Sequence, residues 1–160
     1  PEAHNTLGTI LQALGQPQLA RREFERVLAL EPQAVYALNN LCYSWLSEGN
    51  TSAAGEACRQ ALSAAPRFAV AHNNLALAYA TTGDLGRASE EFGAAGSEAA
   101  REFNLGIVLM AQRRFRAAAA AFDRAAALQP GLPMAVERAR QARQRALAQP
   151  ETEENDGGGR

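Results

Sequence analysis

The chain has 160 residues, of which 47% are hydrophobic and 21% are charged, so it carries enough apolar material for a buried core. Its sixteen basic residues, all arginine, nearly balance seventeen acidic ones and leave a formal net charge of −1. A balanced chain lacks the field of one sign that attracts nucleic acid or an anionic membrane surface. We therefore expect no nucleic-acid partner.

The sequence also predicts a soluble polypeptide without membrane insertion. No apolar run reaches the roughly 18 residues that a membrane span requires, and the first residues do not form a signal peptide. Because the chain starts without Met and inside a repeated pattern, we expect a fragment of a longer protein. Cytoplasmic and periplasmic locations both remain open.

The sequence repeats itself with spacings of 34, 34 and 30 residues. Five parallel tracks carry the period, and they are Leu7, Leu41, Leu75 and Leu105; Ala20, Ala54, Ala88 and Ala118; Phe24, Cys58, Phe92 and Phe122; Pro32, Pro66 and Pro130; and Gly15, Gly49 and Gly83. A fixed period of this length is typical of stacked supersecondary units that bury one another's apolar faces.

These tracks resemble the tetratricopeptide repeat, which places Leu at position 7, a small residue at 8, an aromatic residue at 11, Ala at 20, Phe at 24 and Pro at 32. The resemblance implies an all-α fold, a right-handed α-α superhelix of about nine helices. The expected divisions are repeats at 1–34, 35–68, a shortened 69–98 and 99–132, then a capping helix at 133–148 and a disordered acidic and Gly-rich tail at 149–160.

Each repeat predicts a helical hairpin. Apolar residues fall at helical spacing, a glycine suited to the left-handed conformation ends the first helix, and a second apolar run follows up to the proline. Small residues at positions 8 and 20 should let the two helices approach closely, and large residues at 11 and 24 should fill the remaining gaps.

The third repeat is four residues short between Phe92 and Leu105, about one helical turn. We expect Gly93 and Gly96 to end its second helix early, with Ser97 as the N-cap of the next helix. The shortening predicts either a bend in the groove or a deletion tolerated in a loop, and we favour the deletion.

The fourth repeat has Arg113 where the others have a turn glycine. A left-handed arginine costs on the order of 1 kcal/mol, so we expect a locally altered turn there.

The capping helix should expose arginines and pack through four other residues. The predicted exposed set is Arg138, Arg140, Arg143 and Arg145, and the predicted packing set is Met134, Val136, Ala139 and Ala142.

The resemblance implies that the first helices line a concave groove, chiefly through positions 2, 5, 6, 9, 12 and 13. Asparagine recurs at two of these positions, and we name the position-6 residues Asn40, Asn74 and Asn104 the asparagine ladder. The candidate peptide-binding residues are Asn5, Thr9, Tyr36, Asn39, Asn40, Tyr43, Asn73, Asn74, Leu77, Phe103, Asn104 and Val108.

Asparagine is a poor residue for a helix interior, because its side chain competes for backbone hydrogen bonds. A primary amide carries both donors and an acceptor, so each rung could hold a peptide bond of an extended ligand. The arrangement is similar to the asparagine ladder of the nucleocytoplasmic glycosyltransferase that modifies serine and threonine. The alternative is that these amides only bridge neighbouring helices or bind water. The aromatic residues expected in the groove, Tyr36, Tyr43 and Phe103, could equally be ordinary half-buried helix residues.

One ligand class of the family does not fit this chain. The clamp for chaperone C-terminal carboxylates needs Lys, Asn and Arg side chains at five positions, where this chain has Asn5, Thr9, Asn40, Val70 and Asn74. Only Asn40 matches, and no cation remains to pair with a carboxylate. We expect no binding of chaperone C-termini.

The remaining reactive side chains fall on packing positions. Cys42 and Cys58 occupy positions 8 and 24, and we expect reduced thiols rather than a disulfide. His4 and His72 both occupy position 4, so we expect no metal site. We find no catalytic triad or phosphate loop, and we expect neither an enzyme nor a cofactor.

These observations favour a protein–protein interaction module, an adaptor or scaffold that binds an extended peptide segment in its groove. Two alternatives remain. One is a substrate-recognition domain of a larger enzyme such as a glycosyltransferase. The other is a bacterial pilus or secretion assembly factor, which the Ala-rich and Arg-rich composition suits.

Overall fold

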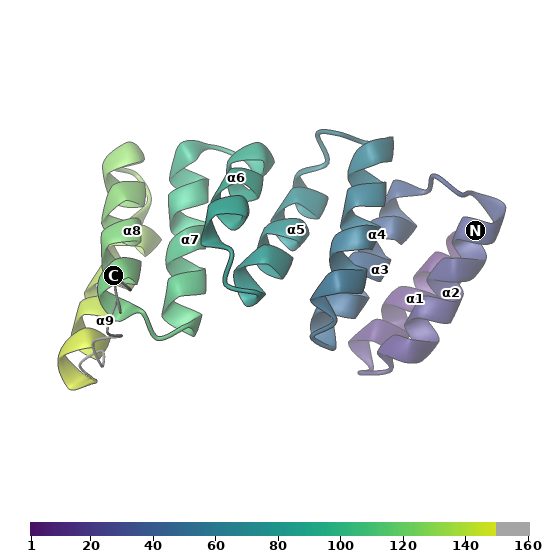
Figure 1. The fold of residues 1–160 in the computed structure, drawn as a ribbon, viewed down its shortest axis with the longest axis horizontal. Coiled ribbons are helices and arrows are strands. Elements are labelled where there is room, and N and C mark those ends of the chain that lie inside the picture. The colour runs from purple at the N-terminus through teal and green to yellow at the C-terminus, as the bar shows by residue number, and fades with distance from the viewer. Residues whose placement is uncertain (150–160) are drawn as a thin grey trace, which may run out of the picture. The chain divides into compact units, whose positions relative to one another are not determined.

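The computed structural model describes residues 1–149, and all regular elements within that range are α-helices (Figure 1). They are α1 (Glu2–Ala13), α2 (Pro17–Leu30), α3 (Val35–Ser47), α4 (Thr51–Ala64), α5 (Ala69–Thr81), α6 (Leu85–Ala95), α7 (Glu98–Ala111), α8 (Phe115–Leu128) and α9 (Pro133–Ala148). The all-α prediction is confirmed for this range. The predicted disordered tail lies outside the described residues, apart from Gln149.

The chain divides into two compact units. The first unit, Pro1–Ser97, contains α1 to α6, and the second begins at Glu98 and contains α7 to α9. In the first unit three hairpins stack, so that α2 packs on α3 and α4 on α5, while α3 also lies beside α1 and α5. In the second unit α8 packs against both α7 and α9. None of the described helices is long and apolar enough to cross a membrane.

The turns inside the hairpins share one geometry. Gly15, Gly49 and Gly83 have φ between 72° and 86°, and each backbone N–H bonds back into the last turn of the first helix. The next N–H reaches the carbonyl five residues earlier, as in the bond from Asp84 to Tyr79. Such a pair of bonds satisfies the carbonyls at a helix end and needs a left-handed residue.

Arg113 adopts this same turn, so the prediction of an altered turn is wrong. Its φ is 62°, its N–H bonds to Met110, and the N–H of Arg114 bonds to Leu109. The two terminal hydrogen bonds and the packing of α7 on α8 outweigh the unfavourable conformation of a single residue. The arginine side chain also donates to Gln149, which follows α9.

The close approach predicted within the hairpins is confirmed. A Cβ added to Gly8 would lie 2.5 Å from Phe24 Cε1, and one added to Gly106 would lie 2.6 Å from Phe122 Cε1. The position-20 alanines are all fully buried. Each phenylalanine ring therefore lies directly against the backbone of the opposing helix, and only a very small residue fits there.

In the second hairpin the same place holds a disulfide. Cys42 on α3 and Cys58 on α4 are bonded, with their Cα atoms 5.2 Å apart, and both side chains are fully buried. The expectation of reduced thiols is wrong, because positions 8 and 24 face each other here, as they do in the pairs Gly8–Phe24 and Gly106–Phe122. Two cysteines at those positions meet within bonding reach, although 16 residues separate them in sequence.

The shortening of the third hairpin falls mainly in its second helix. Helix α6 has 11 residues where α4 and α8 have 14, so the interpretation as a loop deletion is wrong. Gly96 is the C-cap of α6, as expected, but Gly93 lies inside the helix. Only Gly96 and Ser97 separate α6 from α7, and the two units meet in sequence at this point.

Helix α9 packs on α8 through a stripe of alanines. Ala135, Ala139 and Ala142 are buried, and the four arginines are exposed as predicted. Met134 and Val136, predicted to pack, are instead exposed, because they lie one residue to either side of the buried Ala135. The packing face of the cap is narrower than the sequence suggested.

Arg113→Gly should stabilise the chain, since glycine adopts a positive φ without a Cβ clash. The expected gain is about 1 kcal/mol in the free energy of unfolding, measured by urea denaturation. Arg113→Ala serves as the control, because it removes the bond to Gln149 and keeps the strained conformation. A glycine variant no more stable than the alanine variant would contradict the account.

The disulfide should contribute about 3 kcal/mol, the value for a closed loop of this length. Cys42→Ala with Cys58→Ala should lower the urea midpoint, and a reductant should then have no further effect. Cys42→Gly with Cys58→Phe, the pair found in the first hairpin, should recover packing but stay insensitive to reductant. An intact mass showing two free thiols in protein purified without reductant would contradict the disulfide.

Candidate functional site

The candidate site is a pocket between the first helices of the first two hairpins. It has a volume of about 310 Å³ and is lined by Thr9, Gln12, Ala13, Phe24, Asn40 and Tyr43. Helix α1 supplies three of these residues, α3 supplies two, and α2 supplies the ring of Phe24. The structure therefore brings together three predicted residues, Thr9, Asn40 and Tyr43.

Three lining residues were missed by the sequence analysis. Gln12 and Ala13 occupy positions 12 and 13, which the family pattern already assigns to the groove. Phe24 was assigned only to packing. Its ring lies against Gly8, where no side chain intervenes between the two helices, and it also forms part of the pocket lining. The combination of a glycine at position 8 with Phe24 was the sequence feature that could have predicted the contribution of this ring to the pocket.

The ladder asparagines bridge neighbouring first helices. Asn40 Nδ2 on α3 donates to Asn5 Oδ1 on α1 at 2.9 Å, and Asn74 Nδ2 on α5 donates to Asn39 Oδ1 on α3 at 3.0 Å. Each bond joins position 6 of one hairpin to position 5 of the preceding one. The alternative interpretation, amides that bridge helices, thus describes both rungs of the first unit.

The bridging hydrogen bonds do not use all the donors and acceptors of these amides. A primary amide has two N–H donors and a carbonyl with two lone pairs, and each bridge uses one donor of one residue and one acceptor position of the other. Asn74 is nevertheless buried, while Asn5, Asn39 and Asn40 are partly exposed. The bridges fix the orientation of the amides that the groove presents.

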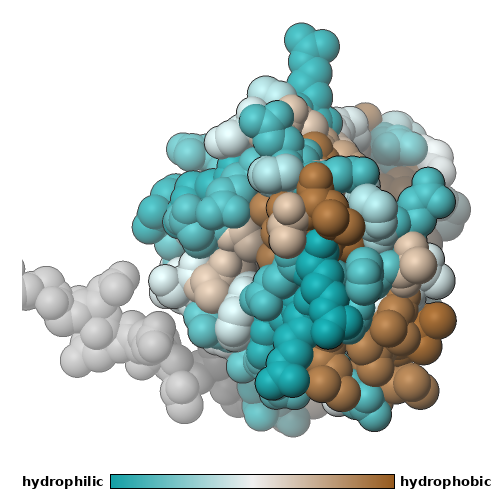
Figure 2. Space-filling view, turned by 90° about the vertical axis from the view of Figure 1, so that its right-hand side faces the viewer, coloured by the Kyte–Doolittle hydropathy of each residue, from teal (hydrophilic) through white to brown (hydrophobic). Residues whose placement is uncertain are grey.

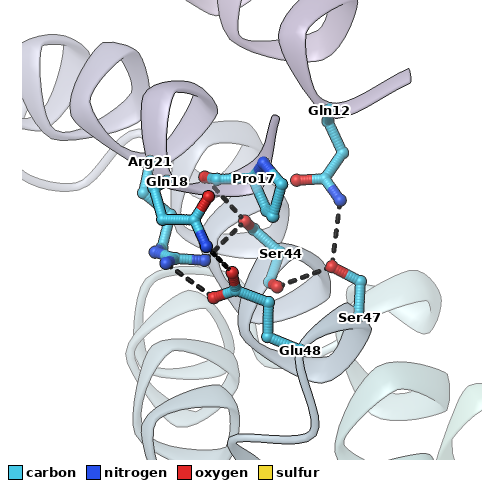
Figure 3. A network of polar contacts seen from close by, with 7 residues as sticks. All are labelled: Gln12, Pro17, Gln18, Arg21, Ser44, Ser47 and Glu48. Carbon is cyan, nitrogen blue, oxygen red and sulfur yellow. Dashed lines mark hydrogen bonds and ion pairs between the residues drawn. The ribbon is translucent and has the colours of Figure 1, made fainter. Parts of the chain in front are cut away.

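A polar network lies at the turn end of the first two hairpins and includes the pocket residue Gln12 (Figure 3). Gln12 Nε2 donates to Ser47 Oγ at 3.0 Å, and Ser47 Oγ donates to the carbonyl of Ser44 at 2.7 Å (Figure 3). The Gln12 Oε1 atom is buried and has no hydrogen-bond partner among residues 1–149. An unpaired buried acceptor is costly, so this atom favours a ligand that supplies a donor.

The centre of the network is the buried Arg21. Its guanidinium donates to Ser44 Oγ at 3.2 Å, pairs with Glu48 at 2.6 Å and lies 3.7 Å from the ring centroid of Trp45. Ser44 Oγ in turn donates to the carbonyl of Pro17. The buried charge is thus paired, hydrogen-bonded and stacked, and it locks α2 to the C-terminal turn of α3.

The other predicted residues divide between the two units. Tyr36 is exposed and donates to Glu31, a hydrogen bond that raises the pKa of the phenol. Leu77 is exposed on α5, beside the partly buried Asn73. Phe103 and Asn104 lie on α7 in the second unit, where Phe103 packs edge-on against Phe122.

Val108 does not belong to an exposed groove surface. Its side chain is 7% exposed, so its placement among ligand-contacting residues is a wrong prediction. Position 10 also holds the buried Ser44 on α3 and Ala78 on α5. This position belongs to the packing face of the first helices and not to their concave face.

Two histidine–glutamate pairs were missed. His4 Nδ1 donates to Glu23 at 2.7 Å and His72 Nδ1 to Glu91 at 2.6 Å, and the partners are 19 residues apart in both hairpins. The hydrogen bond from His4, followed by the charge of Arg26, holds the pKa of Glu23 below its usual value. Within residues 1–149 no group of three His, Cys, Asp or Glu side chains could hold a metal ion.

The tetratricopeptide repeat family model matches residues 5–69 and 103–143, which is more than half of the chain. The chain therefore belongs to the tetratricopeptide repeat family, and proteins of this family act as a class as protein-binding scaffolds. Among curated protein sequences, none matches the chain.

Solved structures share the fold at low sequence identity. MamA is 20% identical with a TM-score of 0.64, over 88% of this chain and 92% of that one. PilF of Pseudomonas aeruginosa is 19% identical with a TM-score of 0.67, over 94% and 77%. PilW, described as a type IV pilus biogenesis factor, is 22% identical with a TM-score of 0.66, over 89% and 70%.

The hydrogen bond between His4 and Glu23 makes part of the stability depend on pH. Because the pKa of Glu23 is lowered in the folded chain from 4.5, this carboxylate stabilises the fold above pH 4.5, and the contribution disappears as the pH falls through the folded value. Glu23→Gln should lower the melting temperature at pH 7, and the difference from wild type should shrink below pH 4.5.

Glu25→Gln is the matched control, because Glu25 is exposed on the same helix. It should leave the melting temperature nearly unchanged at both pH values. A constant difference between Glu23→Gln and wild type from pH 7 to pH 3.5 would contradict the assignment.

Proposed function

We propose that the chain is an adaptor or scaffold that binds an extended peptide segment along the first helices of its first unit. The observation that carries the proposal is the pocket between α1 and α3, where Thr9, Asn40 and Tyr43 meet over the ring of Phe24. Concave pockets with an apolar floor and a few fixed polar groups are typical binding sites.

The chemistry of the pocket favours a neutral apolar or aromatic side chain of the ligand. The six lining residues include no carboxylate, guanidinium or imidazole, so a charged side chain would lose its water without gaining a partner. Phe24, Ala13 and Tyr43 supply apolar surface, and Tyr43 is more than half exposed. The unpaired Gln12 Oε1 supports a side chain or peptide group that carries an N–H.

The spacing of the helices supports an extended ligand. Packed helices lie ~10 Å apart and an extended strand rises ~3.3 Å per residue, so neighbouring first helices would meet the ligand about every three residues. The bridges Asn40–Asn5 and Asn74–Asn39 keep α1, α3 and α5 in one register. Three helices would therefore hold roughly seven ligand residues.

A second candidate is an assembly factor in an oxidising compartment, such as the scaffold of a pilus or secretion system. The buried Cys42–Cys58 disulfide favours it, because structural disulfides form and persist in the periplasm and outside the cell. The intact-mass measurement described for the disulfide, made on protein from its own host, bears on this candidate. Fully reduced protein there would contradict it.

The peptide proposal is tested with a random peptide library displayed on phage and selected on the immobilised chain. Selected peptides are then titrated by fluorescence anisotropy. Tyr43→Ala should weaken them at least tenfold by removing an aromatic contact, and Ala13→Phe should abolish binding by filling the pocket.

Ala29→Phe is the matched control, since Ala29 is an exposed residue on α2 outside the pocket. It should bind the same peptides as tightly as wild type. Circular dichroism spectra of all three variants check that the helices persist. Selected peptides that bind Ala13→Phe as tightly as wild type would overturn the proposal.

A further inference from the structure

The faces on which hairpins pack differ in chemistry along the first unit. Figure 2 shows the end of the molecule formed by α1 and α2, where hydrophobic side chains gather between polar ones. The exposed Leu7 and Ile10 occupy positions 7 and 10, which are buried in α3 and α5. That surface is therefore the ordinary packing face of a first helix and indicates no ligand. The junction between the second and third hairpins is more polar.

A second pocket, of about 230 Å³, lies at this junction. It is formed by α4, the end of α5 and the start of α6, and it shares no lining residue with the pocket between α1 and α3. Two arginines line it, Arg59 on α4 and Arg87 on α6, together with the hydroxyl residues Thr51 and Ser52. The lining residues therefore carry two positive charges and no carboxylate.

The equivalent place between the first two hairpins is filled by an internal ion pair (Figure 3). Arg21 of α2 pairs with Glu48 at 2.6 Å and hydrogen-bonds to Ser44 Oγ. The same guanidinium stacks on Trp45. At this junction the chain itself supplies both the buried cation and its anion.

The ion pair is missing at the second junction. The residues 34 positions later are Gly55, Ala78, Tyr79 and Thr82 in place of Arg21, Ser44, Trp45 and Glu48. The aromatic ring is kept, but the guanidinium and the carboxylate are lost, and the hydroxyl of Thr82 donates to the carbonyl of Tyr79. All four later residues line the pocket. The pocket thus corresponds to the space that the internal ion pair fills at the first junction.

The two arginines keep donors for a ligand. Arg87 lies 4.4 Å from the ring centroid of Tyr79 and donates through Nε to Asp84, and Arg59 donates through Nη2 to Glu56. A guanidinium has five N–H donors, so each of these bonds uses only part of the group. The side chains of Arg59 and Arg87 are 52% and 60% exposed. Ion pairs this exposed contribute little to stability, so a ligand can reach and share both cations.

We propose that this pocket binds a phosphoryl group, either as free phosphate or on a phosphorylated side chain. Its oxygens would accept hydrogen bonds from Arg59, Arg87 and the hydroxyl of Ser52. A phosphoryl group suits two guanidinium groups better than a carboxylate does, because it carries up to two charges and three acceptor oxygens. The ligand would supply the anion that Glu48 supplies at the first junction.

The test titrates the full, isotope-labelled chain with two probes and follows it by two-dimensional NMR. The probes are inorganic phosphate and N-acetyl-phosphoserine amide, used at about pH 7.5, where a phosphate monoester carries close to two charges. Each should saturably shift the Nε–H signals of Arg59 and Arg87 and the backbone amide of Ser52. Sodium chloride at matched ionic strength should not. A response to both probes indicates a phosphoryl group carried on a side chain, and a response to inorganic phosphate alone indicates the free ion.

Two variants test the assignment of the residues. Arg59→Gln with Arg87→Gln should weaken phosphate binding at least tenfold, because it removes both charged donors. Gly55→Arg with Thr82→Glu rebuilds the ion pair of the first junction inside the pocket and should abolish binding. Arg22→Gln is the matched control, since Arg22 is exposed on α2 outside both pockets, and it should bind as wild type does.

Circular dichroism spectra of all variants separate lost binding from lost folding. Wild-type signals that do not saturate would overturn the proposal, as would equal phosphate binding by wild type and Arg59→Gln with Arg87→Gln. N-acetyl-glutamate amide should bind at least tenfold more weakly than N-acetyl-phosphoserine amide. Equal binding of these two probes would overturn the phosphoryl assignment in favour of a carboxylate.

Discussion

The structure depends on the close approach of the two helices in each hairpin. At positions 8 and 24 the chain places Gly8 against Phe24, Cys42 against Cys58 and Gly106 against Phe122, which are two chemically different solutions to one narrow gap. A ring against bare backbone fills the gap by shape, whereas the disulfide fills it with a covalent bond. Because this contact fixes the angle between the two helices, it also fixes which residues face the groove and which face the next hairpin.

The asparagines connect each hairpin of the first unit to the next one. A hydrogen bond from position 6 to position 5 of the preceding hairpin joins α3 to α1 and α5 to α3. An amide in this place lowers the intrinsic helix propensity, and the bridge offsets that cost. Asn40 both bridges α3 to α1 and lines the pocket, so substituting it would disturb the packing of the helices together with the pocket. The pocket residues Tyr43 and Ala13 separate the two roles more cleanly.

Much of the fold followed from the sequence, because the five residue tracks report the packing of each hairpin directly. The errors arose where a local rule competed with a pattern of the whole chain. A propensity rule disfavoured Arg113 in a left-handed turn, yet the terminal hydrogen bonds impose that turn. The packing role of positions 8 and 24 favoured reduced thiols at Cys42 and Cys58, yet the fold places these positions face to face. The pocket was only half predicted, since the contribution of Phe24 depends on the missing side chain of Gly8.

The first helix of a hairpin has two different faces, and the repeat pattern determines which residue types occur on each. On α1, positions 5, 9, 12 and 13 hold the polar or small residues Asn5, Thr9, Gln12 and Ala13, which suit an extended ligand that arrives with its own backbone donors and acceptors. Positions 3, 7 and 10 hold residues that pack a second helix, whose backbone is already satisfied and which brings only apolar side chains.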